Sequence, residues 1–233
     1  MTKSSAIFSP WRPAIVNPTL APGTVALWRF PVTGPPVETL LSMEERKRAQ
    51  RLRAAEKARA FVVARTRLRQ ILGRYLAMDP RAIAFHFNDH GKPFLADDPL
   101  TFNLSHSAGW GLCAVAQEED VGVDLEAVDP GLDYAAMATR FFSAAEYTWL
   151  QSLPASRRCR SFYRLWTRKE AWLKGRGRGF ATRDQNLPTP HIAVTSGAAG
   201  DWSLRNLPVA KGYVGAIAVA GTVKKIERWC WQD

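Results

Sequence analysis

The sequence predicts an α+β fold of two similar lobes, each a mostly antiparallel sheet packed on a long helix. In both halves of the chain, a long helix-like stretch is followed by short segments of alternating hydrophobicity. Both halves also contain a strand-like segment rich in small residues, GWGLCAVA at 109–116 and GYVGAIAVAG at 212–221. This shared plan indicates a pseudo-duplicated fold with a cleft between the lobes, where we expect the active site.

The composition indicates an anionic partner. The 233 residues carry a formal net charge of +11, which suits nucleic acid, an anionic membrane, a phosphorylated small molecule or an acidic protein. Three scattered cysteines without metal-ligand spacing fit a reducing compartment. The sequence has no 18-residue apolar run and no apolar stretch typical of a signal peptide near its start. We therefore expect a cytoplasmic monomer without a membrane partner.

The proline content marks the start of the first lobe. Residues 1–23 carry four prolines without periodicity, and we expect them to form an extended leader. The N-terminal lobe is expected at 24–118. The C-terminal lobe is expected at 119–233. Thr24–Phe30 alternates like a strand and opens the first sheet.

A long basic region follows, beginning at a capping box on Ser42. Its second half has strongly amphipathic spacing and predicts a long helix. The basic run at 46–69 has three interpretations: a nucleic-acid surface, a solvated helix face, or a helix in which two or three arginines grip phosphates. Arg59 and Arg65 adjoin an apolar segment, so they are better placed to be held rigidly than the outer arginines.

Two polar motifs come next. Ala82–Asn88 alternates like a strand and leads into a turn ending in Gly91-Lys92-Pro93. A lysine after a glycine can present its ammonium beside exposed backbone N–H groups, which suits phosphate, although most such sequences are ordinary turns. The strand Thr101–Ser107 carries Ser105 and His106, which point to opposite faces and cannot form a catalytic pair. A ligand-contacting loop and a structural histidine remain the alternatives.

The segment Val121–Val128 places two carboxylates on one face of a strand, Asp124 and Glu126. Carboxylates about 7 Å apart along a strand can converge on one hard cation. Mg²⁺ favours one or two carboxylates together with water and substrate phosphate. The alternative is a half-exposed edge strand with a polar face.

The segment Phe162–Gly179 combines an apolar helical face with charges that it does not explain. Lys169 projects from the middle of the apolar face, Glu170 from its edge, and Lys174 follows one turn later. Burying a charge is costly unless the charge is paired. An ordinary Glu170–Lys174 pair along the helix is one explanation, and a functional site is the other.

The remaining segments complete the fold. Ser143 and Glu146 form a second capping box, which gives Glu146 a structural role. Short strand candidates follow at His191–Thr195, Trp202–Leu204, Tyr213–Ala220 and Ile226–Trp229.

Taken together, these motifs resemble the Sfp-type 4′-phosphopantetheinyl transferases. The resemblance covers residues 42–180 directly and 24–220 in overall layout. It rests on a basic helix, Gly91-Lys92-Pro93, Phe102-Asn103-Leu104-Ser105-His106-Ser107, Gly122-Val123-Asp124-Leu125-Glu126, Arg140-Phe141-Phe142-Ser143-x-x-Glu146 and Trp166-x-x-Lys169-Glu170-Ala171-x-x-Lys174. The pairing of the G-V-D-L-E and W-x-x-K-E-A-x-x-K motifs is highly specific.

The resemblance implies transfer of the phosphopantetheine arm of coenzyme A to a serine of an apo acyl or peptidyl carrier protein. The reaction would release 3′,5′-ADP and use Mg²⁺, or Mn²⁺ in its place. By motif match, the metal ligands would be Asp124, Glu126 and Glu170. The nucleotide or its 3′-phosphate would be contacted by Arg59, Lys92, Ser105 and His106. Glu170 is also the favoured general base, directly or through water, and Lys174 would contact the reacting phosphate.

Three rival functions remain. A nucleic-acid-binding protein would explain the charge, but not Asp124, Glu126 and Glu170, which would repel phosphate without a metal. A Mg²⁺-dependent phosphohydrolase would release phosphopantetheine to water without a carrier. A degenerate family member would bind coenzyme A alone, which the intact acidic triad disfavours. We therefore expect an acidic carrier protein, and no nucleic acid, as the macromolecular partner.

Overall fold

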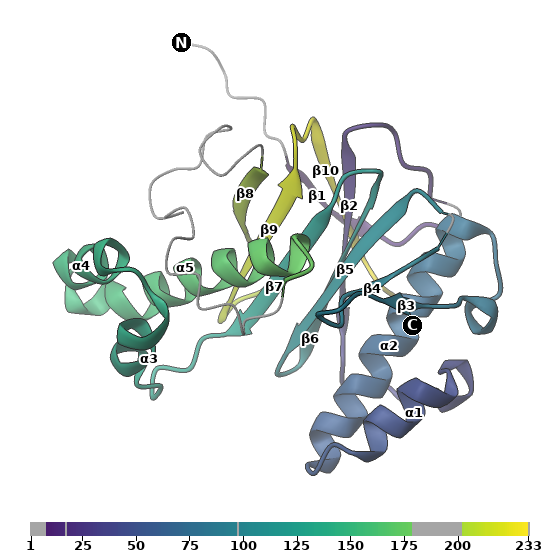
Figure 1. The fold of residues 1–233 in the computed structure, drawn as a ribbon, viewed down its shortest axis with the longest axis horizontal. Coiled ribbons are helices and arrows are strands. Elements are labelled where there is room, and N and C mark those ends of the chain that lie inside the picture. Colours follow the sequence, from purple (N-terminus) through teal and green to yellow (C-terminus); the bar gives the residue numbers. More distant parts are fainter. Residues whose placement is uncertain (1–7, 17, 97, 179–201, 233) are drawn as a thin grey trace. The chain divides into compact units, whose positions relative to one another are not determined.

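The computed structural model describes residues 8–16, 18–96, 98–178 and 202–232, drawn in Figure 1. The chain forms two compact units. The first comprises residues 1–86, 93–118 and 223–233, and the second comprises residues 87–92 and 119–222. Each unit holds a sheet and at least one long helix. The predicted α+β fold of two lobes is thereby confirmed.

The first unit is built on a five-stranded sheet in the order β1-β10-β2-β6-β5. The antiparallel pairs are β2–β6 and β6–β5, whereas β10 runs parallel to both β1 and β2. The C-terminal segment therefore belongs to the first unit, not to the lobe at 119–233 where it was expected. Its strands are β1 (Phe8–Pro13), β2 (Thr24–Pro31), β5 (Leu100–Ser107), β6 (Trp110–Gln117) and β10 (Lys225–Cys230). Part of the expected leader, β1, is an edge strand of this sheet.

Two helices accompany this sheet, α1 (Met43–Gln50) and α2 (Ala55–Leu76). The predicted capping box is present at α1, where Ser42 and Glu45 exchange side-chain and backbone bonds. The apolar side of α2 packs with the inner side chains of β2, β5 and β6 in one core. This core includes Trp28, Phe30, Leu68, Ile71, Leu72 and Phe102.

The predicted strand at Ala82–Asn88 is wrong for its first half. Residues Pro80–Ala82 form a short 3-10 helix, because Asp79 caps its start and proline occupies the first position. Only β3 (His86–Phe87) is extended in a ladder, and it pairs with β4 (Pro93–Phe94).

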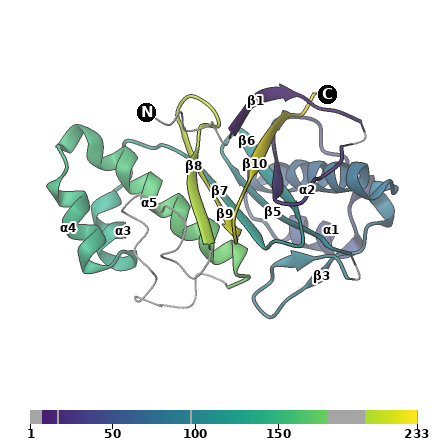
Figure 2. The same ribbon diagram turned by 90° about the horizontal axis from the view of Figure 1, so that it is seen from above.

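The second unit contains the three-stranded antiparallel sheet β7-β9-β8. The helix α5 runs along this sheet and contacts all three strands, as Figures 1 and 2 show. The first half of α5 packs with α3 and α4, and its second half packs with β8 and β9. The elements are β7 (Val121–Ala127), α3 (Tyr134–Phe141), α4 (Ala144–Ser152), α5 (Ala155–Gly175), β8 (Trp202–Leu207) and β9 (Tyr213–Ala220). The strand predicted at His191–Thr195 lies outside the described residues.

None of the helices in the described ranges combines the length and the apolar character that crossing a membrane requires.

Candidate active site

The site begins with a close approach between β7 and α5. A Cβ atom added to Gly122 would lie 2.0 Å from the carbonyl oxygen of Ala171 and 2.3 Å from the amide nitrogen of Gly175. No side chain fits there, so the glycine lets the strand backbone pack directly on the helix. Strand alternation then puts Asp124 and Glu126 on the same face as Gly122, toward α5. The glycine of the G-V-D-L-E motif is therefore needed to place its carboxylates.

The structure brings Asp124 and Lys174 into direct contact. Lys174 donates from Nζ to Oδ1 of Asp124 over 2.6 Å. The Asp124 side chain is 3% exposed and that of Lys174 is 32% exposed. Glu126 and Glu170 are half-buried. The alternative of a solvated polar face is thus excluded for Asp124, and Lys174 bonds across to the strand.

The pKa shifts show that these groups share one electrostatic environment. Burial, together with the carboxylates of Asp124 and Glu126, raises the pKa of Glu170 to about 7, although Lys174 acts in the opposite direction. Burial tends to lower the pKa of Lys174, but Asp124, Glu170 and Glu126 raise it above its ordinary value. Three carboxylates therefore lie close enough to Lys174 to raise the pKa of its ammonium.

The donor chemistry of this cluster fits a hard cation. Three carboxyl groups against one ammonium leave an excess of negative charge once they are ionised, and carboxylate oxygens are the ligands that Mg²⁺ takes. Within the described ranges, however, no three Asp, Glu, His or Cys side chains are already arranged to hold a metal ion. The residues supply a suitable donor set, while the side chains of Asp124 and Lys174 are paired with each other.

Lys169 has a structural partner. Its Nζ lies 2.5 Å from Oε2 of Glu146 and donates to the carbonyl oxygen of Phe141 over 3.1 Å. The same Glu146 oxygen accepts from the Ser143 amide in the predicted capping box. A buried ion pair therefore ties α5 to the start of α4. It explains the lysine in the apolar face one position before Glu170.

Lys92 lies in the second unit and bonds to the end of α5. Its Nζ donates to the carbonyl oxygen of Gly175 over 2.6 Å and to Asp120 over 3.1 Å. Only 14% of its side chain is exposed. The ammonium that was expected to meet the nucleotide thus already has two acceptors.

The other three expected nucleotide contacts belong to the first unit. Arg59 donates to the carbonyl oxygens of Thr33 and Gly34. Ser105 is buried and His106 is exposed, as alternation along β5 requires. Their contact with coenzyme A stays a prediction.

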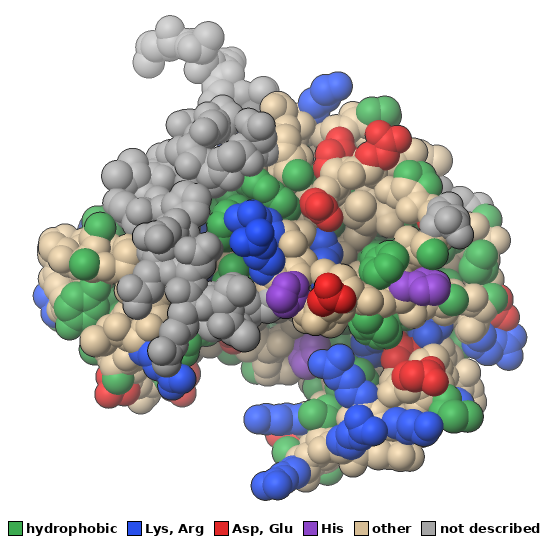
Figure 3. Space-filling model, in the orientation of Figure 1, with side chains coloured by type: hydrophobic (Ala, Val, Ile, Leu, Met, Phe, Trp, Pro, Cys, Tyr) green, Lys and Arg blue, Asp and Glu red, His purple; other side chains and the backbone are tan. Residues whose placement is uncertain are grey.

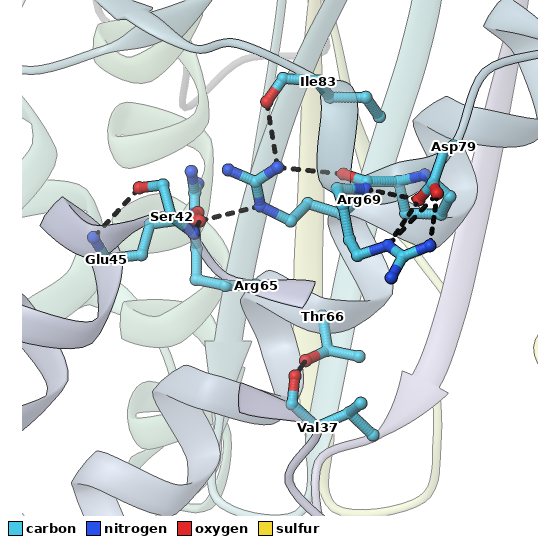
Figure 4. A network of polar contacts seen from close by, with 10 residues as sticks. Val37, Ser42, Glu45, Arg65, Thr66, Arg69, Asp79 and Ile83 are labelled. Carbon is cyan, nitrogen blue, oxygen red and sulfur yellow. Dashed lines mark hydrogen bonds and ion pairs between the residues drawn. The ribbon is translucent and has the colours of Figure 1, made fainter. Parts of the chain in front are cut away.

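The basic run is divided between buried and exposed side chains. Arg65 and Arg69 are buried and both bond to Glu45, as Figure 4 shows. Arg65 is therefore rigidly held, as expected, but by a carboxylate. Exposed lysines and arginines gather over α1 and the start of α2 (Figure 3). Those outer side chains remain available to an anionic partner.

Comparison with known proteins identifies the family. Residues 120–218 match the family model of the 4′-phosphopantetheinyl transferase superfamily, and residues 36–118 match that of the 4′-phosphopantetheinyl transferase N-terminal region. The 4′-phosphopantetheinyl transferase HetI of Nostoc sp. is 39% identical over 222 residues, which cover 91% of this chain and 94% of HetI. The 4′-phosphopantetheinyl transferase Sfp of Bacillus subtilis is 32% identical over 145 residues, which cover 61% of this chain and 63% of Sfp. The chain therefore belongs to the 4′-phosphopantetheinyl transferase superfamily.

Proposed function

We propose that the protein transfers the 4′-phosphopantetheine arm of coenzyme A to a serine of an apo acyl or peptidyl carrier protein, with Mg²⁺, and releases 3′,5′-ADP. The observation that carries this proposal is the cluster of Asp124, Glu126, Glu170 and Lys174 on β7 and α5 of a chain that belongs to the transferase superfamily. The cluster has the excess of carboxylates that a cation-dependent reaction on pyrophosphate requires.

Asp124, Glu126 and Glu170 are the proposed metal ligands. A bound Mg²⁺, or Mn²⁺ in its place, would neutralise charge on the pyrophosphate oxygens of coenzyme A. Oxygen ligands from a rigid strand and a helix packed on it suit a cation that also keeps water and substrate phosphate in its shell. The direct packing of Gly122 against α5 supports this assignment because it fixes the strand that supplies two of the ligands.

The proposed transfer is a displacement at phosphorus. The carrier serine Oγ forms a bond to the phosphorus that bears the pantetheine arm, and the bond from that phosphorus to the 3′,5′-ADP oxygen breaks. The ADP leaves with the electron pair. The serine proton passes to Glu170, directly or through water, and Lys174 offsets the charge that develops on the phosphate. A metal-bound carboxylate is a weak base, so the ligand role of Glu170 takes precedence.

Coenzyme A would be held at its nucleotide end by Arg59, Ser105 and His106, to which the family resemblance adds Lys92. This assignment rests on the family pattern. The Lys92 ammonium already donates to the carbonyl oxygen of Gly175 at the end of α5, so we leave Lys92 out of the proposed nucleotide contacts. The outer basic side chains and the net charge of +11 would steer an acidic carrier toward a monomeric cytoplasmic enzyme.

The charge arrangement weakens the alternative of a nucleic-acid-binding protein. Arg65 and Arg69 are committed to Glu45, so they do not add to a nucleic-acid surface. The excess of carboxylates near Lys174 would also repel a polynucleotide.

The test is to incubate the protein with coenzyme A, Mg²⁺ and apo carriers of the fatty-acid, polyketide and peptide-synthetase types, and then to weigh each carrier. We expect at least one carrier to gain one phosphopantetheine mass. The absence of a gain on every carrier would refute the proposal. Release of free phosphopantetheine without a carrier would instead identify a phosphohydrolase.

A further inference from the structure

The short turn at 87–92 belongs to a different unit from the residues that flank it in the sequence. The residues on either side belong to the first unit, whereas the turn belongs to the second. Its side chains reach the C-terminal end of α5, the helix that carries Glu170 and Lys174. This is an unusual use of a turn that the sequence marks only as a glycine-lysine-proline motif.

Asn88 organises the turn from within. Its Oδ1 accepts from the backbone N–H groups of His90 and Lys92, over 3.0 and 2.9 Å. Two backbone bonds between Asn88 and the residues at 91 and 92 close the turn. With its oxygen committed in this way, the amide Nδ2 points outward and donates to the carbonyl oxygen of Gly177 over 2.9 Å.

Lys92 makes the second connection. Its ammonium donates to the carbonyl oxygen of Gly175, the last residue of α5, over 2.6 Å. Carbonyls at a helix C-terminus lack partners within the helix, and a cation there also interacts favourably with the helix dipole. The turn therefore supplies a donor and a positive charge where α5 needs both.

The helix end is shaped to receive the turn. Gly177 has a φ of +64°, the left-handed conformation that often ends a helix, and the Arg178 amide donates back to the Leu173 carbonyl. A Cβ atom on Gly177 would lie 2.5 Å from Nδ2 of Asn88. Glycine is thus required both for the backbone conformation and for the approach of Asn88.

We propose that Asn88 and Lys92 are positioning residues that hold the last turns of α5, and with them Glu170 and Lys174, in place against β7. The proposal rests on the proposed function for its kinetic consequence. It assigns Lys92 to the helix end, not to the nucleotide. The effect of loosening the helix end would reach Lys174 first, because it lies one residue before Gly175.

The sharpest variant is Asn88→Asp. It keeps the oxygen that accepts the two turn amides, but it replaces the donor to Gly177 with a carboxylate facing a helix C-terminus. We expect kcat for carrier modification to fall about 10- to 100-fold, since small misplacements of reacting groups have effects of this size. We expect the Kd for coenzyme A to change less than about twofold, because Asn88 is not assigned to the ligand. Amide hydrogen exchange at residues 174–178 should become faster.

Asp89→Ala is the matched control, since Asp89 is an exposed neighbour in the same turn. It should leave kcat, coenzyme A affinity and exchange at 174–178 unchanged. Lys92→Met, which keeps the apolar stem, should behave like Asn88→Asp. A loss of coenzyme A affinity in Lys92→Met with unchanged exchange would return Lys92 to the nucleotide and overturn its positioning role.

Two results with Asn88→Asp would overturn the proposal. One is exchange at 174–178 equal to that of the wild-type protein, which would mean that the turn does not hold the helix end. The other is faster exchange with unchanged kcat, which would mean that the contact does not position the reacting groups. The exchange measurement needs no substrate, so failure of the proposed function, seen as no transfer by the wild-type protein, is distinguishable from failure of this inference.

Discussion

Two clusters of charged side chains, one in each unit, differ in their charge balance. In the first unit, Glu45 accepts from Arg65 over 2.5 Å and from Arg69 over 2.7 Å, and all three side chains are less than 10% exposed. In the second unit, Asp124, Glu126 and Glu170 all lie close enough to Lys174 to raise the pKa of its ammonium. The first cluster has two cations for one carboxylate, and the second has three carboxylates for one cation.

The two clusters also differ in how fully their carboxylates are paired with donors. Both oxygens of Glu45 are used, and Arg69 also donates to the carbonyls of Pro80 and Ile83 (Figure 4). Such a network joins parts of the chain and has a structural role. In the second unit, burial and, after it, repulsion from Asp124 and Glu126 raise the pKa of Glu170, so this cluster would be stabilised by an added cation. The two clusters therefore differ in charge balance, and the cluster with the excess of carboxylates is the one that we propose to be functional.

The largest effect is expected from Asp124→Ala and Glu170→Ala. Each should lower the rate of transfer by more than about 100-fold. Removing a hydrogen-bond partner of a metal ligand typically costs about 10- to 100-fold in activity, and removing the ligand itself should cost more. The free energy of unfolding should change by no more than about 2 kcal/mol, since each variant also relieves repulsion between carboxylates. Rates of carrier modification and denaturant unfolding provide the measurements. Full activity in either variant would remove that residue from the metal site.

Glu45→Ala should have the opposite effects: a large loss of stability and an unchanged kcat. It leaves Arg65 and Arg69 buried without their carboxylate, and breaking a buried pair costs about 3–5 kcal/mol. The folded fraction should keep the wild-type kcat, because no catalytic role is assigned to Glu45. Glu44→Ala is the matched control, since Glu44 is the exposed neighbour and its replacement should leave the free energy of unfolding essentially unchanged. Equal stability of the two variants would show that the network does not hold the fold.

A smaller effect is expected at the ion pair next to Glu170. Lys169→Met removes the ammonium but fills the space, and it should lower the free energy of unfolding by about 2–4 kcal/mol by leaving Glu146 buried without its cation. Combining it with Glu146→Gln, which keeps an acceptor for the capping box, should recover part of this loss. Denaturant unfolding of the two single variants and the double variant measures the coupling. Additive losses would contradict the assignment of Lys169 to this pair.

Local sequence patterns single out the charged residues of the candidate site. Strand alternation puts Asp124 and Glu126 on one face, and the helical spacing of 162–174 singles out Lys169 and Glu170 as charges that need an explanation. These inferences succeed because they depend on neighbours in the sequence. The two capping boxes, at Ser42 and Ser143, are found for the same reason.

Features set by distant contacts do not follow from such patterns. Arg65 and Arg69 bond to a carboxylate 20 and 24 residues away, so the basic run alone gives no sign that they are used internally. Gly122 is visible in its motif, but its close approach to α5 requires the packed sheet and helix. The contact from Asn88 to Gly177 spans 89 residues, and nothing local predicts it. Placement of β10 in the first unit likewise depends on parallel pairing with β2.

The most direct test of the central claim is the rate at which the metal-depleted protein modifies an apo carrier as free Mg²⁺ is increased from zero. If the carboxylate cluster on β7 and α5 is the transfer centre, the rate should be negligible in chelator, rise to saturation with added Mg²⁺, and remain negligible throughout in Asp124→Ala. Transfer at the full rate in chelator, or an unchanged response to Mg²⁺ in Asp124→Ala, would contradict the account.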